Sequence, residues 1–224
     1  MAGPRNILIT GGTSGIGLAL VDRLSKRHRV LVTGRKISPA LEAMIVQRPD
    51  LDFLALDQSQ PEKITKTLTS YLEKKKWDQI HNAVLNAGTG FVGDPVHETS
   101  DKIAQTIAVN LMANIELSHC LFPYLQKTKG KLTFVGSTAR KGAKNFSSYA
   151  ASKAGLHGFA RALKEEWRNK VAVQILHPGP TKTDMHEKAG LKLGMIRHLF
   201  ASPEAVAHVI ENSMGRNRFS TKMT

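Results

Sequence analysis

The sequence has little of what secreted, membrane-spanning or metal-binding proteins require. Its single cysteine, Cys120, cannot form an internal disulfide, as is usual for proteins of reducing compartments. Its apolar runs are short, and none approaches the roughly eighteen residues of a membrane span or resembles a secretory leader. The nine histidines include no H-x-x-x-H pair. We therefore expect a cytoplasmic protein with no metal site and no membrane partner.

Acidic and aromatic residues are also scarce. Only 18 aspartates and glutamates stand against 32 lysines and arginines, which gives a net charge of +14, and aromatic residues make up 6%. The basic clusters are spread along the chain, at residues 26–29, 74–76, 127–131 and 140–141. They lie mostly at expected helix ends and turns and carry no interleaved aromatic residues on which bases could stack. This pattern favours a solvated surface with no specific nucleic-acid partner; a nucleic-acid-binding surface is the alternative.

Strand-like and helical patterns alternate along the whole chain. Apolar runs typical of strands occur at residues 7–10, 30–33, 53–56, 83–85, 132–135 and 171–176. Helical patterns lie at residues 15–27, 39–47, 61–76, 101–127, 147–169 and 203–214. This alternation predicts one α/β domain over residues 1–224, with a parallel sheet covered by helices on both faces. Ligands of such sheets bind beyond the carboxyl ends of the strands.

The first expected strand ends in a glycine-rich turn. The spacing of Gly11, Gly15 and Gly17 is G-x-x-x-G-x-G, and a helical pattern follows it at once. In a dinucleotide-binding unit, glycines make the turn, let the backbone approach the pyrophosphate and allow close helix–strand packing. The helix N-terminus then offers N–H groups to the phosphates. The turn therefore predicts a dinucleotide site, against the alternative of an ordinary strand–turn–helix.

The end of the second expected strand indicates which dinucleotide is bound. A protein that prefers NAD usually has an acidic residue there for the ribose 2′-hydroxyl, whereas an arginine accommodates a 2′-phosphate. This chain has Arg35 followed by Lys36 and no acid. Thr13 and Ser14 in the glycine turn offer further hydroxyl contacts to that phosphate. We therefore expect NADP(H) to be preferred over NAD(H).

A tyrosine and a lysine form the most informative pair in the chain. Tyr149 and Lys153 are four residues apart in a helical pattern, so they share a helix face, and Ser137 lies twelve residues upstream of the tyrosine. A lysine charge roughly 5 Å away would lower the pKa of the phenol by about two units. That change would bring the phenol towards the range in which a general acid–base operates. By itself the spacing is common, and a tyrosine packed beside a surface lysine is the alternative.

These motifs together resemble those of the short-chain dehydrogenase/reductase family, in its shorter classical form, over essentially the whole chain. The resemblance is carried by Thr10-Gly-Gly-Thr-Ser-Gly-Ile-Gly17, Asn86-Ala-Gly88, Asn110, Ser137, Tyr149-Ala-Ala-Ser-Lys153 and Pro178-Gly-Pro-Thr-Lys-Thr183. It implies a Rossmann-type doubly wound sheet and a nicotinamide-dependent oxidoreductase that acts on a small carbonyl or alcohol.

The resemblance also implies a role for each matched residue. Tyr149 would be the acid–base, and Ser137 would hydrogen-bond the substrate oxygen. Lys153 would bind the nicotinamide ribose and lower the tyrosine pKa. Asn110 would hold a water that connects this lysine to solvent, and Asp57 would contact the adenine. The expected cofactor-binding residues are Gly11, Thr13, Ser14, Gly15, Ile16, Gly17, Arg35, Asp57, Asn86, Ala87, Gly88, Tyr149, Lys153, Pro178, Gly179, Thr181 and Thr183.

The C-terminal part of the chain is less informative. Apolar residues within 184–202 are compatible with a short lid over the substrate, and a helix packed on the core would look the same. Many family members have a glycine-rich final strand that helps to form tetramers, and its motif Gly-x-x-x-x-Asp-Gly-Gly is absent here, so a tetramer is not predicted. The helices that carry Asn110 and Tyr149 are those through which the family commonly dimerises, which predicts a homodimer. The alternative function is a non-catalytic dinucleotide-sensing or regulatory module with a basic surface.

Overall fold

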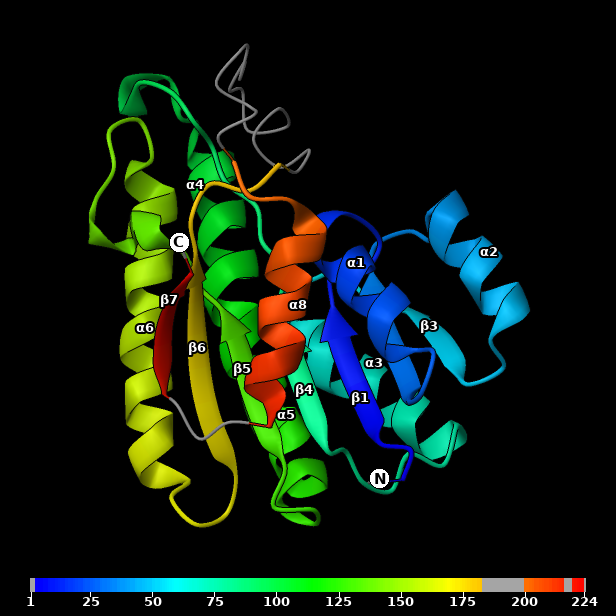
Figure 1. Ribbon diagram of the computed structural model, residues 1–224. Helices are drawn as coiled ribbons and strands as arrows, with labels where there is room; N and C mark the ends of the chain where they lie inside the picture. The colour runs from blue at the N-terminus through cyan, green and yellow to red at the C-terminus, as the bar shows by residue number, and fades with distance from the viewer. Residues whose placement is uncertain (1–2, 183–199, 216–218, 224) are drawn as a thin grey trace.

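The computed structural model describes residues 3–182, 200–215 and 219–223. Its centre is one parallel sheet of seven strands in the order β3-β2-β1-β4-β5-β6-β7 (Figure 1). The strands are β1 (Asn6–Thr10), β2 (Arg29–Gly34), β3 (Leu51–Ala55), β4 (Asn82–Leu85), β5 (Lys131–Val135), β6 (Ala172–Pro178) and β7 (Ser220–Met223). The doubly wound α/β architecture expected from the sequence is confirmed.

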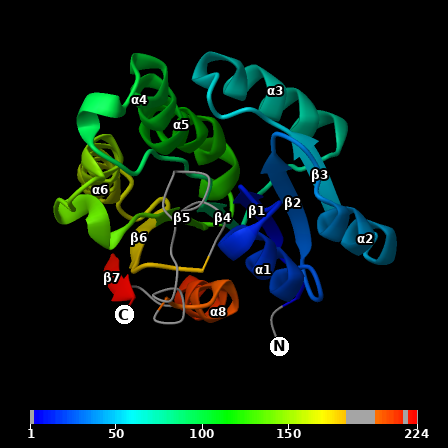
Figure 2. The ribbon, with the colours of Figure 1, turned by 90° about the horizontal axis from the view of Figure 1, so that it is seen from above.

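Helices cover both faces of the sheet. They are α1 (Gly15–Leu24), α2 (Pro39–Gln47), α3 (Pro61–Lys74), α4 (Ser100–Ile107), α5 (Ala113–Gln126), α6 (Ser147–Glu166) and α8 (Pro203–Met214). Seen from above, α3, α4, α5 and α6 lie on one side of the sheet, and α1, α2 and α8 lie on the other (Figure 2). No helix in the described part of the chain is long and apolar enough to cross a membrane.

The alternation of apolar residues along the strands builds a core on each face. Ile7 and Ile9 of β1 pack into the cluster under α1 and α8, whereas Leu8 packs into the cluster under α3 and α5. Strands buried on both faces read as continuous apolar runs, which is why the sequence revealed them. From β1 to β3 successive strands are added towards one edge of the sheet, and from β4 onwards they are added towards the other edge. The order therefore reverses between β1 and β4, and this is the point where a ligand crevice opens in such folds.

The helical pattern at residues 101–127 corresponds to two helices and a wider turn between them. A π-helical turn spans Ala108–Met112 and joins α4 to α5. The Asn114 amide donates hydrogen bonds to the carbonyl oxygens of Val109 and Asn110, at 3.2 and 3.0 Å. A π turn leaves such carbonyls without their usual partners, and a side chain that fills them stabilises it. The turn carries Asn110, which is fully buried.

The sheet has a seventh strand that the sequence patterns did not indicate. β7 pairs in parallel with β6, from Ile175↔Ser220 to Pro178↔Met223, and it completes the sheet. This four-residue strand carries no apolar run long enough to be recognised, and only the open edge of β6 makes it a strand. Most of the expected lid over residues 184–202 lies outside the described residues, namely residues 184–199, and so does Thr183.

Candidate active site

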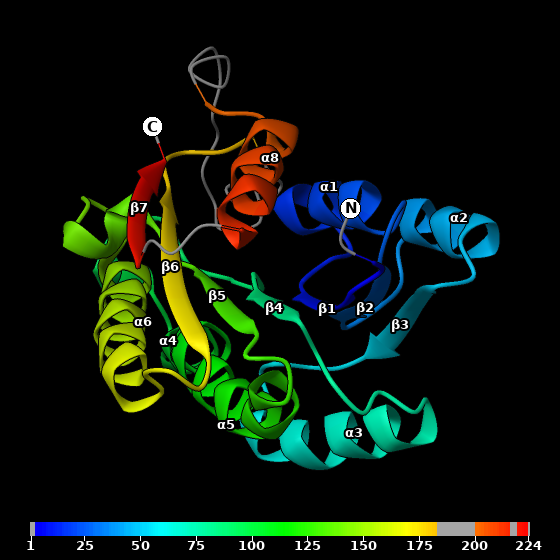
Figure 3. The same cartoon turned by 60° about the horizontal axis from the view of Figure 1, so that its bottom comes forward.

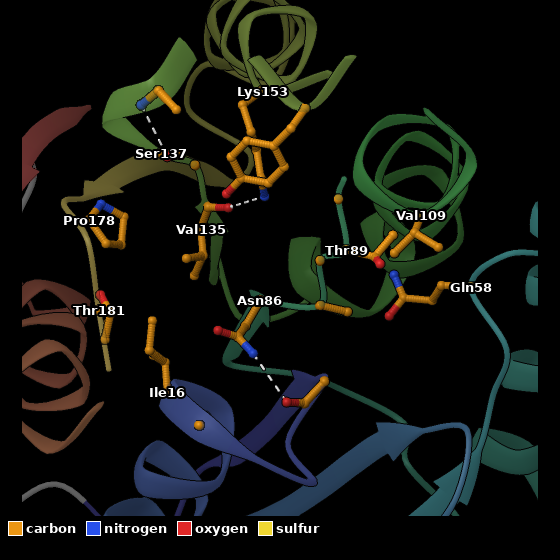
Figure 4. Close-up of a pocket in the computed structure, with 18 of the residues that line it drawn as sticks. Ile16, Gln58, Asn86, Thr89, Val109, Val135, Ser137, Lys153, Pro178 and Thr181 are labelled. Carbon is orange, nitrogen blue, oxygen red and sulfur yellow. Dashed lines mark hydrogen bonds between the residues drawn. The ribbon is translucent and has the colours of Figure 1, made fainter. Parts of the chain in front are cut away.

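A cavity of about 500 Å³ lies beyond the carboxyl ends of the strands. Its walls come from the turns that follow β1, β2, β3, β4, β5 and β6 and from the first turns of α6. Figure 4 shows these walls facing one another, with Ile16 on one side and Ser137 and Lys153 on the opposite side. The cavity therefore occupies the position where the sequence predicted a ligand crevice.

The glycine-rich turn gives one wall an accessible backbone. Gly11 and Gly15 have φ values of 64° and 52°, which favour glycine. A Cβ on Gly17 would lie 2.2 Å from the carbonyl oxygen of Gly11, so Gly17 allows the close packing of α1 and does not line the cavity. Ser14 is the N-cap of α1 but makes no side-chain capping bond. The first N–H groups of α1 are therefore available to an anion at this end of the cavity.

Asn86 connects two of the walls. Its amide donates to the carbonyl oxygens of Thr10 and Gly11, at 3.1 and 3.2 Å. The Thr10 hydroxyl in turn accepts from the backbone N–H groups of Asn86 and Ala87, at 3.0 and 3.1 Å. These bonds hold the turn after β4 against the glycine-rich turn, with Ala87 and Gly88 lining the cavity. Asn86 thus helps to build the site.

Arg35 and Asp57 line the end of the cavity near β2 and β3. Arg35 is exposed and makes no hydrogen bond or ion pair with any other described residue, and Lys36 is not part of the lining. Asp57 accepts from the backbone N–H and the hydroxyl of Ser59, at 2.9 and 2.8 Å. The Ser59 backbone bond is the main reason that the pKa of Asp57 is lowered, and the Arg35 charge contributes. Asp57 therefore stabilises a turn as well as facing the cavity.

Gln58 is a residue of this wall that the sequence did not indicate. Its side chain lines the cavity beside Thr89 and Val109 (Figure 4) and is only 5% exposed. Its amide nitrogen has no hydrogen-bond partner in the described structure. A buried donor without a partner costs free energy until a ligand or water satisfies it. A glutamine after an acidic turn residue carries no sequence signal for such a role.

Tyr149, Ser137 and Lys153 meet at the opposite end of the cavity. Helix α6 presents Tyr149 and Lys153 on one face, as the spacing predicted, and the turn after β5 presents Ser137. Ser137 caps the short 3₁₀ turn Thr138–Lys141, and its hydroxyl accepts from the Ala139 N–H at 3.1 Å. The Lys153 ammonium donates to the Val135 carbonyl oxygen at 3.0 Å and lies 5.8 Å from the centre of the Tyr149 ring.

Burial controls the protonation of this cluster. Desolvation raises the pKa of Tyr149, and a hydrogen bond with Ser137 partly offsets the increase. Desolvation also lowers the pKa of Lys153 to about 8. In this structure burial therefore dominates the pKa of Tyr149, and the lowering by the lysine charge stays a prediction. The spacing placed the two groups correctly, but it contained no information about how deeply they would be buried.

Asn110 lies behind the cavity and does not line it. Its side-chain oxygen accepts from the Thr89 N–H at 2.9 Å, and its amide donates to the Thr89 carbonyl at 2.8 Å and to the Ser152 hydroxyl at 3.0 Å. A Cβ on Gly88 would lie 3.4 Å from the Asn110 side-chain oxygen and 3.5 Å from the Lys153 nitrogen. Asn110 therefore fixes the loop after β4 to α6, next to the lysine. The water relay expected from the resemblance stays a prediction.

The last wall follows β6. Pro178, Gly179 and Thr181 line the cavity, and the Thr181 hydroxyl donates to the Gly179 carbonyl at 3.1 Å. Thr181 also forms a parallel bridge with Ala201. Of the expected site residues within the described structure, only Gly17 and Asn110 do not reach the cavity.

Comparisons with known proteins agree with this geometry. A family model described as short chain dehydrogenase matches residues 5–193. The chain belongs to the short-chain dehydrogenase family. The 3-oxoacyl-(acyl-carrier-protein) reductase MabA of Mycobacterium bovis is 30% identical over 185 residues, which cover 81% of this chain and 71% of MabA. The NADPH-dependent 1-acyldihydroxyacetone phosphate reductase of Saccharomyces cerevisiae is 30% identical over 197 residues, which cover 84% of this chain and 65% of that reductase.

Solved structures share the fold. An alcohol dehydrogenase from the archaeon Thermococcus sibiricus, complexed with 5-hydroxy-NADP, matches with a TM-score of 0.86 at 18% identity. The match covers 98% of this chain and 95% of that chain. The chain is thus an oxidoreductase of the short-chain dehydrogenase family with the fold that its motifs predicted.

In this short-chain dehydrogenase, the wall beside Tyr149 consists of residues that the motifs did not indicate. They are uncharged and come from two loops and from α4 and the turn after it: Thr89, Gly90, Gln105, Val109, Thr138, Ala139, Gly142, Ala143 and Phe146. A Cβ on Gly90 would lie 2.7 Å from the Tyr149 ring, so this glycine lets the loop approach the phenol. Loop residues follow no periodic pattern, which is why the sequence did not reveal them.

Proposed function

We propose that this protein is an NADP(H)-dependent carbonyl reductase, in which Tyr149 exchanges a proton with the substrate oxygen. One observation carries the proposal. A single cavity has Ser137, Tyr149 and Lys153 at one end and the unpaired guanidinium of Arg35 at the other. The cluster of Ser137, Tyr149 and Lys153 suits proton transfer at a carbonyl. The guanidinium of Arg35 suits the binding of a phosphate on an adenosine ribose.

The residues of the cavity fit a dinucleotide. Gly11 and Gly15 line the cavity with positive φ values, in a glycine-rich turn of the kind that lets backbone approach a pyrophosphate, and the N-terminus of α1 favours the charge of that group. The partnerless amide nitrogen of Gln58 offers a donor near Asp57 at the adenosine end. The remaining contacts would come from Thr13, Ser14, Ile16, Asn86, Ala87, Gly88, Pro178, Gly179 and Thr181. When bound, the nicotinamide supplies or accepts the hydride.

The proton chemistry follows from burial. Because its pKa is raised, Tyr149 is fully protonated at neutral pH and can donate to the oxygen of a carbonyl that is being reduced. Negative charge develops on that oxygen, and the Ser137 hydroxyl provides a second hydrogen bond to it. Lys153, with a pKa of about 8, is mostly charged at pH 7 and stabilises the phenolate that the transfer leaves behind.

The cofactor preference is argued from Arg35. A charge-assisted hydrogen bond to a 2′-phosphate contributes roughly 1.5–3 kcal/mol, and no acidic residue at the end of β2 competes for the guanidinium. The yeast relative is NADPH-dependent by name, which supports the same preference. The uncharged wall beside Tyr149 favours a neutral carbonyl or alcohol at the reacting end.

A cytoplasmic homodimer is part of the proposal. On α4 and the turn that follows it, Ile103 is 41% exposed and Met112 is 51% exposed. These side chains provide apolar surface on the helices through which dimerisation was expected. Light scattering on the purified protein at micromolar concentration should give the mass of two chains, and a monomer would contradict this part of the proposal.

The test of the activity is direct. The loss of NADPH absorbance is followed with a panel of aldehydes, ketones and quinones, for the wild type and for Tyr149→Phe. Turnover of any substrate by the wild type, abolished in the variant at unchanged NADPH affinity, would support the proposal. Tight NADPH binding without turnover across the panel would favour the dinucleotide-sensing alternative, for which the described structure offers no separate observation.

A further inference from the structure

Two histidines lie side by side behind the turn that carries Ser137. His177 is in β6, directly before the cavity-lining Pro178, and His157 is in α6, one helical turn after Lys153. Helix α6 lies beside β6 in both Figure 1 and Figure 3. The His157 Nδ1 and the His177 Nε2 are 3.1 Å apart, which is within hydrogen-bond distance, and the ring centres are 5.1 Å apart. Neither histidine lines the cavity, so the pair stands outside the site described above.

His177 is buried against the backbone of the Ser137 turn. It is 2% exposed, whereas His157 is half-buried. A Cβ on Gly136 would lie 2.5 Å from the His177 Nδ1, so the lack of a side chain at Gly136 lets the imidazole reach this backbone. The Gly136 N–H donates to the Leu176 carbonyl oxygen at 2.7 Å and is therefore already used. The imidazole of His177 thus packs on the peptide that leads into Ser137.

The hydrogen bond between the two imidazoles restricts where each proton lies. Burial lowers the pKa of both rings, to about 4 for His177, so both are mostly neutral at pH 7 and one must donate to the other. If His177 donated through its Nε2, its Nδ1 would be a bare acceptor, and no described residue donates to that buried atom. If His157 donates through its Nδ1 instead, His177 carries its own proton on Nδ1.

The groups around the pair favour the second arrangement. Burial and nearby charges lower the pKa of His177, whereas the Ser137 backbone raises it, which is the effect of a carbonyl oxygen and not of an N–H group. No hydrogen bond joins that oxygen to the ring in the described structure, so the attraction is between two dipoles at short range. Besides burial, the charges of Arg140 and Arg161 lower the pKa of His157, and cations favour a lone pair on its Nε2 over an N–H group.

From these contacts we infer that His177, oriented by His157, is a positioning residue that holds the turn carrying Ser137. The inference rests on the proposed function, in which the Ser137 hydroxyl bonds the substrate oxygen. A displaced turn would weaken a bond that matters most in the transition state. Loss of the imidazole should therefore lower kcat and leave the affinity for the cofactor nearly unchanged.

The kinetic test uses a substrate that the wild type reduces with NADPH. His177→Phe keeps a ring and removes both nitrogens, and it should lower kcat about tenfold or more while the NADPH Kd stays within about twofold. In a Ser137→Ala background the same substitution should change kcat less than about twofold, because the hydroxyl that it positions is already absent. His177→Asn, whose amide can replace the Nδ1–H group, should restore part of the lost activity. His119→Phe is the matched control, because His119 lies on α5 with its ring against Phe159, and its kcat should equal that of the wild type.

A second measurement does not depend on turnover. Nitrogen-15 NMR of the histidine rings at pH 7 distinguishes a protonated ring nitrogen from a bare one. His177 should be protonated on Nδ1 in the wild type and should lose this preference in His157→Phe. Because His157 is only half-buried, this variant should fold normally, and it carries the kinetic test if His177→Phe does not fold. In that case kcat should fall at least about threefold, again only while the Ser137 hydroxyl is present.

Three results would overturn the inference. They are a wild-type His177 protonated on Nε2, an unchanged kcat in His177→Phe, and an equal loss of kcat with and without the Ser137 hydroxyl. A wild type that reduces none of the carbonyls would instead reject the proposed function. The NMR measurement would then still decide whether His177 directs its N–H group towards the Ser137 turn.

Discussion

Replacement of Arg35 by aspartate is the sharpest test of the cofactor proposal. The guanidinium lines the cavity, is exposed and has no ion-pair partner among the described residues, so its removal should disturb little else in the fold. The variant loses a charge-assisted hydrogen bond, worth roughly 1.5–3 kcal/mol. It also introduces repulsion of roughly 1 kcal/mol, the value for unit charges about 4 Å apart in water. Together these predict an NADPH affinity lowered by roughly 10² to 10³-fold.

NADH should respond differently because it has a hydroxyl in place of the 2′-phosphate. An aspartate can accept a hydrogen bond from that hydroxyl, so NADH should lose little affinity or gain some. Fluorescence titration of the wild type and of Arg35→Asp with each cofactor gives the change in affinity for NADPH and the change in affinity for NADH. Lys36→Asp is the control: it changes the net charge by the same amount, but at a residue that does not line the cavity. It should lower the NADPH affinity less than about threefold at physiological salt. Equal losses for NADPH and NADH in Arg35→Asp would refute the reasoning.

Further substitutions test the catalytic cluster and the fold. Tyr149→Phe should abolish turnover, because the proton donor is removed. The NADPH affinity should stay within about twofold, because the substitution removes no charged group that contacts the cofactor. Retained activity would rule out the tyrosine as acid–base. Gly17→Ala should destabilise the protein by roughly 1–3 kcal/mol in chemical denaturation, because its Cβ would lie 2.2 Å from the Gly11 carbonyl oxygen. Gly158→Ala, in an exposed and open part of α6, should instead stabilise it by up to about 1 kcal/mol. The free energy of unfolding should fall as pH drops from 6.5 towards 4. In this range His177 takes up a proton in the unfolded chain, whereas the buried imidazole of the folded protein, with a pKa of about 4, stays neutral. A His177→Gln variant that shows the same fall would contradict this prediction.

Local sequence was sufficient for most of the fold. The strands are buried on both faces, so their apolar runs stand out against the polar turns, and six of the seven strands were predicted within a few residues. The pairing of Tyr149 with Lys153 and the close packing at Gly17 follow from helix geometry and from the absence of a side chain. These features depend on residues that are neighbours along the chain.

Features that depend on contacts between distant segments were not predictable in this way. β7 forms because β6 offers an open edge, and its own four residues carry no strand signal. The hydrogen bonds of Asn110 depend on the π turn and on Thr89 and Ser152, which come from two other segments. The same holds for Asn82 of β4 and Lys131 of β5, which are far apart in sequence and are paired by the strand register.

The protonation of the catalytic cluster shows the difference most clearly. The sequence by itself determined that a tyrosine, a lysine and a serine would be available at one end of a parallel sheet, because spacing sets helix faces and strand ends. Only the tertiary structure decided that burial raises the pKa of Tyr149 and lowers that of Lys153 to about 8. Desolvation depends on every element packed around a group, and no local spacing contains that information.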